Sequence, residues 1–185
     1  MFERLEMAPP DAILGLTEAF KQDSNPDKIN LGVGVYKDAR NKTPVLASVK
    51  QAEERILAAE DTKSYMPIPG DPAYGALVRQ MLFGEGHEIL ASNRARTAHT
   101  PGGTAALRVA GDLLKQQFPG AAIWLSAPTW ANHAGVFNAA GLDVKQYPYY
   151  DADEKCLNFD AMMQSLRTVP AGDVVLFHEI GRAHV

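Results

Sequence analysis

The segment from Arg96 to Val109 carries the residue types best suited to chemistry in this 185-residue chain. It predicts a short strand, a turn over residues 100–104 that contains Gly102 and Gly103, and then the start of a helix. The first N–H groups of a helix have no partner inside the helix, and the helix dipole adds partial positive charge there. Because glycines leave room for an anion, the turn is predicted to bind a phosphate group.

A purely structural interpretation of this turn remains open. No Gly-Lys-Ser/Thr follows it, as a P-loop requires, and the G-x-G-x-x-G pattern of dinucleotide sites is missing. A helix start capped by Thr104, with glycine for close packing, would have the same sequence. The turn alone therefore does not decide between a binding site and a helix cap.

Trp130 is the second candidate, because it follows the buried-strand pattern of residues 121–126. An indole offers a flat face to a planar ring, although an isolated tryptophan is more often a core residue. A phosphate site and a stacking ring at neighbouring strand ends meet the needs of a small planar cofactor with one phosphate. Pyridoxal phosphate fits that description.

Composition narrows the class of partner. The net charge is −4, with no basic run, which argues against nucleic acid and anionic membranes as partners. No apolar stretch approaches the roughly 20 residues of a membrane-spanning helix, and the N-terminus lacks the regions of a signal peptide. The single cysteine, Cys156, cannot form an internal disulfide, so a reducing, cytoplasmic setting is expected. No metal site is predicted.

Periodicity predicts alternating helices and strands. Helices are expected over residues 11–20, 45–59, 72–83, 104–118, 132–140 and 160–167, with Asp71 and Gly84 as the caps of the third. Strands are expected over residues 29–36, 94–99, 121–126, 144–147 and 173–178. This alternation indicates an α/β fold with a largely parallel sheet covered on both faces. Ligands of such sheets bind outside the carboxyl ends of the strands.

The third predicted helix has an apolar stripe that is expected to face the core. Its residues are Tyr74, Leu77, Val78, Met81 and Leu82.

Several separated segments resemble one family. Residues 100–108 resemble the phosphate-binding turn of class I aminotransferases, in the aspartate and aromatic aminotransferase branch. Residues 13–16, 30–36, 42–45 and 128–133 resemble segments of the same family in the same order, and the resemblance runs from about Met1 to His178.

The resemblance implies a particular fold and domain arrangement. The fold is the three-layer sandwich with a mainly parallel sheet of fold type I pyridoxal-phosphate transferases, here truncated. Residues 1–44 would form an N-terminal arm and small-domain segment, and residues 45–178 the first part of the large cofactor-binding domain.

The resemblance also implies roles for cofactor-binding residues. Gly102, Gly103 and Thr104 would hold the cofactor phosphate. Trp130 would stack on the pyridine ring and border the substrate, and Tyr65 would reach the phosphate in the neighbouring subunit.

Three further residues acquire expected roles in the same way. Gly34 would donate a backbone N–H to the substrate carboxylate, and Leu16 would line the substrate pocket. His133 would stand behind the carboxylate that pairs with the pyridine nitrogen and fix its orientation. Ala105 departs from the glycine that many members carry, and His99, directly before the turn, matches no assigned position.

The implied activity is transfer of an amino group between aspartate, or an aromatic amino acid, and 2-oxoglutarate. Pyridoxal phosphate would be the cofactor, amino acids and 2-oxo acids the substrates, and a homodimer the full-length state. The lysine that forms the Schiff base and the other catalytic groups lie downstream of His178 in the family. No catalytic residue is therefore assigned here, and the fragment itself is expected to be inactive.

Beyond His178 the sequence departs from the family pattern. Residues 179–185 resemble a translated sequencing adapter and are expected to be non-native. Two other functions stay open: a nucleotide-dependent oxidoreductase that uses the same helix-end phosphate site, and a non-catalytic module that binds a phosphorylated ligand.

Overall fold

The computed structural model describes residues 14–29, 36–40 and 42–178. Its contacts divide the chain after Glu60, and a second compact unit spans Asp61–His178. The boundary between residues 44 and 45, which rests on the family resemblance, stays a prediction about the larger protein. Among the described residues, no helix combines the length and the apolar character that crossing a membrane requires.

The first unit contributes helices α1 (Leu14–Gln22) and α2 (Ala47–Ala59). Both coincide closely with predicted helices. The apolar side chains of α2, Val49 and Ile56 among them, are nevertheless exposed. These side chains therefore find no covering partner within the described chain.

Helix α3 (Pro72–Phe83) confirms the capping signals of its sequence. Asp71 Oδ1 accepts hydrogen bonds from Ala73 N at 2.6 Å and Tyr74 N at 3.0 Å, and Gly84 ends the helix with a φ of +84°. The prediction that its apolar stripe lies in the core is wrong. Tyr74, Leu77, Met81 and Leu82 are exposed, because the main described neighbour of α3 is only the short helix α4 (Glu88–Ala91).

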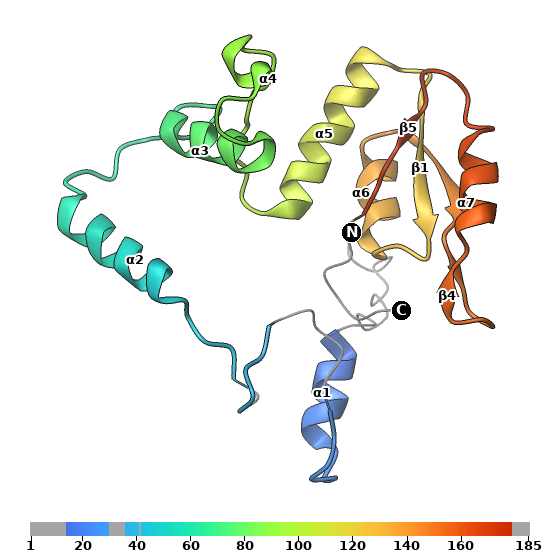
Figure 1. Ribbon diagram of the computed structural model, residues 1–185, viewed down its shortest axis with the longest axis horizontal. Helices are drawn as coiled ribbons and strands as arrows, with labels where there is room; N and C mark the ends of the chain where they lie inside the picture. Colours follow the sequence, from blue (N-terminus) through green and yellow to red (C-terminus); the bar gives the residue numbers. More distant parts are fainter. Residues whose placement is uncertain (1–13, 30–35, 41, 179–185) are drawn as a thin grey trace, which may run out of the picture. The chain divides into compact units, whose positions relative to one another are not determined.

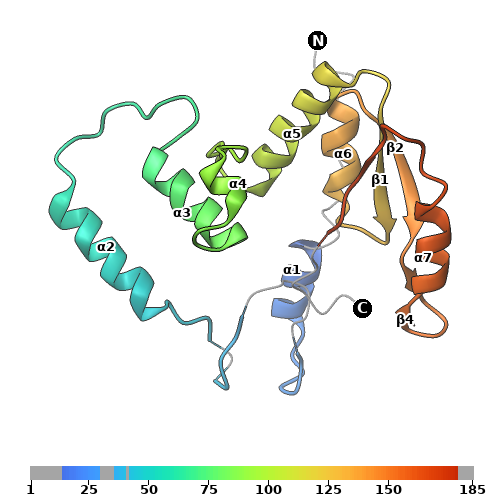
Figure 2. The same cartoon turned by 45° about the horizontal axis from the view of Figure 1, so that its top comes forward.

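A parallel sheet lies at the centre of the second unit. Its strands are β1 (Ala122–Ala127), β2 (Asp143–Pro148) and β5 (Val174–Val175), in the order β2-β1-β5. Ile123 is level with Val144 on one side and with Val174 on the other. Helices α5 (Gly103–Gln117) and α6 (Asn132–Ala139) lie together on one side of the sheet, and α7 (Phe159–Leu166) lies on the other (Figures 1 and 2). The predicted layered α/β arrangement is confirmed in this unit.

The core forms where α5 and α6 meet the sheet. Ile123, Leu125, Phe137 and Leu142 are its buried apolar side chains. Gly111 allows the two helices to approach closely, because a Cβ atom there would lie 3.0 Å from the Cβ of Ala140.

The strand prediction differs from the structure in several details, one of which is that only Val174–Val175 of the predicted strand 173–178 form a strand. Residues 94–99 form no strand, because a strand needs a ladder of hydrogen bonds to a second strand and none of the described strands pairs with them. A short antiparallel hairpin of β3 (Tyr150–Asp151) and β4 (Cys156–Leu157), which was not predicted, connects β2 to α7. Residues 30–35 of the predicted strand 29–36 lie outside the described residues.

Asp173 joins the amino ends of two strands. Its Oδ1 accepts a hydrogen bond from Ala122 N at 2.9 Å, and its Oδ2 accepts one from Trp124 Nε1 at 2.8 Å. Lys145 Nζ lies 3.9 Å from Oδ2. The Trp124 hydrogen bond, followed by that of Ala122, holds the pKa of the Asp173 carboxyl below its usual value.

We expect Asp173→Asn to lower the melting temperature of the full-length polypeptide by a few degrees at neutral pH, because its Nδ2 cannot accept a hydrogen bond from Trp124. A carboxyl whose pKa is lowered by folding stabilises above its unfolded pKa of about 3.9 and loses that effect as the pH falls further. The difference between variant and parent should therefore shrink below about pH 4. Asp143→Asn is the matched control, since Asp143 lies near the same lysine but is exposed. Equal losses in both variants would contradict the role of Asp173.

The described chain also exposes many large apolar side chains, including Leu113, Phe118, Phe159 and Phe177. We expect residues 1–185 alone to bind a hydrophobic dye strongly and to melt without a cooperative calorimetric transition. A monodisperse preparation with a sharp transition would show that this expectation is wrong.

Candidate cofactor site

The predicted phosphate turn is held in a shape that glycine favours. Gly102 has φ +88° and ψ 174°, a backbone region that is essentially restricted to glycine. Its N–H donates to Thr100 O at 2.8 Å, and its carbonyl accepts from the Thr100 hydroxyl at 3.2 Å and from Ala106 N at 3.1 Å. The turn therefore fixes the direction in which α5 begins.

The first amides of α5 are left free by this turn. Within the described chain, the N–H groups of Gly103, Thr104 and Ala105 have no hydrogen-bond partner, and no side chain caps the helix. The hypothesis that Thr104 is the cap is wrong, because Gly102 occupies that position and Thr104 is already helical. Cβ atoms built at Gly102 and Gly103 would meet nothing within 4 Å, so the turn itself is not crowded by other described residues.

Trp130 and His133 are brought into contact. Trp130 follows β1 and is half-buried, and its ring meets that of His133 edge-on, with 5.3 Å between the centroids. His133 N also donates to Trp130 O at 2.9 Å. The loop between β1 and α6, together with the first turn of α6, therefore places both rings near the carboxyl end of β1.

His133 is buried and belongs to a small polar cluster. Its Nδ1 lies 2.7 Å from the Thr129 hydroxyl oxygen, and the ring of His178 lies 4.7 Å away. Burial, and then the nearby His178, lowers the pKa of His133 below its usual value. His133 is thus kept neutral near physiological pH.

His178 and Thr129 are the residues that sequence reasoning did not single out. Val175 pairs with Trp124, so continuing the register places His178 level with Ala127 at the site. His178 Nδ1 is buried and has no hydrogen-bond partner in the part of the chain that the structure describes. Thr129 could have been found from its position four residues before His133, and His178 from its place at the end of a predicted strand.

Tyr65, Leu16 and Gly34 are the other residues with predicted roles. Tyr65 belongs to the same unit but is fully exposed, at 103% of its reference area. Leu16 lies on α1 in the other unit and is exposed, and Gly34 lies outside the described residues. The roles of all three stay predictions.

These observations fit a phosphorylated aromatic cofactor. Three unpaired amides suit a phosphate, the half-buried indole suits a planar ring, and the unsatisfied His178 Nδ1 suits a polar partner nearby. Across the described ranges, no group of histidine, cysteine, aspartate and glutamate side chains could hold a metal ion.

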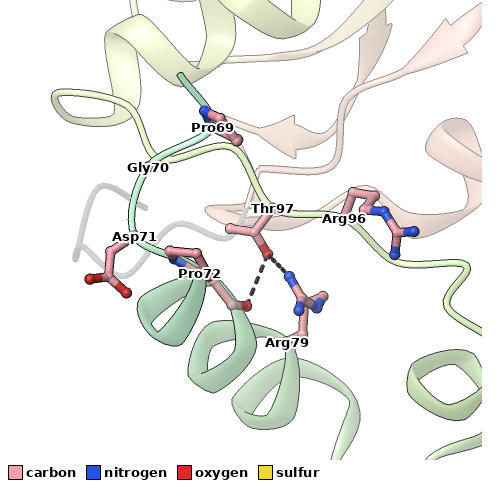
Figure 3. Close-up of a pocket in the computed structure, with 8 residues that line it drawn as sticks. Pro69, Gly70, Asp71, Pro72, Arg79, Arg96 and Thr97 are labelled. Carbon is pink, nitrogen blue, oxygen red and sulfur yellow. Dashed lines mark hydrogen bonds between the residues drawn. The ribbon is translucent and has the colours of Figure 1, made fainter. Parts of the chain in front are cut away.

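A pocket of about 280 Å³ lies elsewhere, between the turn before α3 and residues 96–97 (Figure 3). Across it the Thr97 hydroxyl donates to Gly75 O at 3.1 Å and accepts from Arg79 Nη1 at 3.1 Å. These two hydrogen bonds attach α3 to the segment that leads into the phosphate turn.

Thr129→Val should lower the free energy of unfolding of the full-length polypeptide by about 1–3 kcal/mol, because it leaves the buried Nδ1 of His133 without its partner. Thr129→Ser keeps the hydroxyl and should restore most of the loss. Urea denaturation measures both variants. An equally large loss in Thr129→Ser would show that the methyl group, not the hydrogen bond, is responsible.

Comparisons with known proteins identify the family. The family model for aminotransferase class I and II matches residues 26–180. The chain is 53% identical over 178 residues to an aspartate aminotransferase of Escherichia coli and 48% identical over 177 residues to an aromatic-amino-acid aminotransferase of Pseudomonas aeruginosa. These matches cover 96% of the chain but only 45% and 44% of the two relatives, so the chain spans about half their length.

A solved structure shows the same relation. An aromatic-amino-acid aminotransferase from Burkholderia pseudomallei, covalently bound to pyridoxal phosphate, superposes with a TM-score of 0.89 at 42% identity. The match covers 96% of this chain and 45% of that one. This chain belongs to the class I and II aminotransferase family.

Proposed function

We propose that this chain is the N-terminal part of a pyridoxal-phosphate-dependent aminotransferase that moves an amino group between aspartate, or an aromatic amino acid, and 2-oxoglutarate. The observation that carries the proposal is the start of α5, where three main-chain N–H groups find no partner among the described residues and the turn before them has a backbone shape that is essentially restricted to glycine. Relatives named for both aspartate and aromatic amino acids support the reaction class and leave the choice of amino acid open.

The backbone at Gly103 and Thr104 would bind the phosphate. These amides are oriented before any ligand arrives, because Gly102 and Thr100 hold the turn, so little reorganisation accompanies binding. Trp130 would cover the ring and exclude water from one side of it. Pyridoxal phosphate, when bound, supplies an electron sink for reactions at the amino acid α-carbon.

His133 would act behind the ring rather than on the substrate. When the Thr129 hydroxyl donates to Nδ1, the neutral imidazole carries its proton on Nε2 and can donate there to an acceptor. The lowered pKa of His133 favours this neutral form. Its role would be to hold a neighbouring group in one orientation.

A homodimer is part of the proposal. The fully exposed ring of Tyr65 leaves its hydroxyl available to a second copy of the chain, where it would contact the partner's cofactor phosphate. A buried Tyr65 would not allow this arrangement.

The experiment uses the full-length polypeptide encoded at the locus. As a second route, residues 1–178 replace the matching part of the Escherichia coli relative. Retention of pyridoxal phosphate is read from its near-visible absorption, and amino transfer to 2-oxoglutarate is assayed with aspartate and with aromatic amino acids. Binding of a nicotinamide cofactor instead would favour the oxidoreductase alternative. Retention of the cofactor without transfer to any 2-oxo acid would favour the binding module.

In that protein, Gly102→Ala should weaken pyridoxal phosphate binding by roughly tenfold or more, because a Cβ atom strains the turn that aims the amides. Gly120→Ala is the matched control, since Gly120 lies beyond the other end of α5 and has open space for a Cβ atom. Equal affinities in the two variants would contradict the phosphate site.

Trp130→Ala should weaken the same binding by roughly tenfold through the lost ring contact, whereas Trp130→Phe should lose less. Fluorescence or absorbance titration of the cofactor-free protein measures both dissociation constants. Unchanged affinity in Trp130→Ala would show that the indole is only a packing residue.

A further inference from the structure

His99 has no role in the proposed chemistry, yet it stands between two segments that the proposed function uses. It directly precedes the turn at Thr100–Gly102 that leads into α5. Its backbone N–H donates to Pro69 O at 2.9 Å. Pro69 in turn follows residues 61–68, the segment that carries Tyr65.

The contact between His99 and Gly70 is close and specific. Gly70 is buried and has φ +90°, and a Cβ atom there would lie 2.2 Å from the Cβ of His99. That distance is far below van der Waals contact, so only glycine fits against His99 at this point. On its other side, the imidazole stacks on the ring of Tyr74, with centroids 4.4 Å apart and an angle of 25°.

The same segment is attached a second time, two residues earlier. The Thr97 hydroxyl bonds to Gly75 O and to Arg79 Nη1, as Figure 3 shows. Gly75 is also buried, and a Cβ atom there would lie 3.3 Å from the Cβ of Thr97. Residues 97–99 are therefore held against α3 and the turn before it. The position of Thr100, the next residue along the chain, depends on these contacts.

We propose that His99, clamped between Gly70 and Tyr74, is a positioning residue that couples the phosphate turn of one subunit to the Tyr65 that reaches the other subunit's cofactor. This inference rests on the proposed function. The turn would bind its own subunit's phosphate while the segment before Pro69 extends to the partner. Because the contacts of His99 join the turn to the residues that follow this segment, ordering of the turn by phosphate also fixes the end of the segment 61–68 that carries Tyr65.

The test measures pyridoxal phosphate affinity in the full-length dimer for the parent, His99→Ala, Tyr65→Phe and the double variant. His99→Ala keeps the Cβ atom and the backbone hydrogen bond and removes only the ring. We expect roughly a tenfold loss in each single variant and no further loss in the double variant, because His99 acts through Tyr65. His99→Phe keeps a stacking ring and should bind nearly as tightly as the parent.

A structural control separates this coupling from general destabilisation. His87→Ala removes the helix cap that His87 Nδ1 provides by accepting from Ile89 N, in the same unit and away from the turn. It should leave the affinity unchanged. Hydrogen exchange gives a readout independent of catalysis: cofactor binding should slow exchange at residues 61–68 in the parent, and less so in His99→Ala.

The outcomes are distinguishable. If the losses in pyridoxal phosphate affinity multiply in the double variant, or if His99→Ala binds as tightly as the parent, the proposed coupling through His99 is wrong. Neither result affects the proposed function. A parent protein that never retains pyridoxal phosphate overturns both the coupling and the proposed function.

Discussion

The start of α5 is the constraint on which the rest of the site depends. A helix of 15 residues places its partial positive charge at the same end as three N–H groups that have no partner in the part of the chain that the structure describes. Leaving such groups unpaired costs free energy wherever water is excluded, so an anion there stabilises the helix as well as being bound by it. The glycine-only backbone at Gly102 and the Thr100 hydrogen bonds maintain this geometry.

The parallel sheet brings the other groups to the same edge. β1 ends in the loop that carries Thr129 and Trp130, α6 then begins with His133 in its first turn, and the register with β5 places His178 beside them. Asp173 lies at the amino ends of the strands, where its hydrogen bonds with Trp124 and Ala122 join β5 to β1. The strands are thus joined at their amino ends, and the candidate site residues lie at their carboxyl ends.

Local signals in the sequence predicted helix ends correctly where the capping residues lie beside the helix in the chain. Asp71, Pro72 and Gly84 bounded α3 correctly, because a cap acts within one turn of the chain. Two signals that depend on a distant partner failed, although the strands that became β1 and β2 were predicted correctly. The stripe of α3 is exposed and residues 94–99 form no strand, since burial and strand pairing require neighbours that the described chain does not supply. The contact of His133 with His178 joins residues 45 positions apart, so periodicity could not reveal it.

The site residues divide by unit, and this division has a consequence for specificity. The residues predicted to hold the cofactor phosphate and ring, Gly102 to Thr104 and Trp130, belong to the unit built on the sheet. Two of the three residues predicted to touch substrate, Leu16 and Gly34, belong to the other unit. Under the proposed function, changes in the first unit would alter the contacts to the substrate, while the α5 amides and the ring contact, which belong to the second unit, would stay intact.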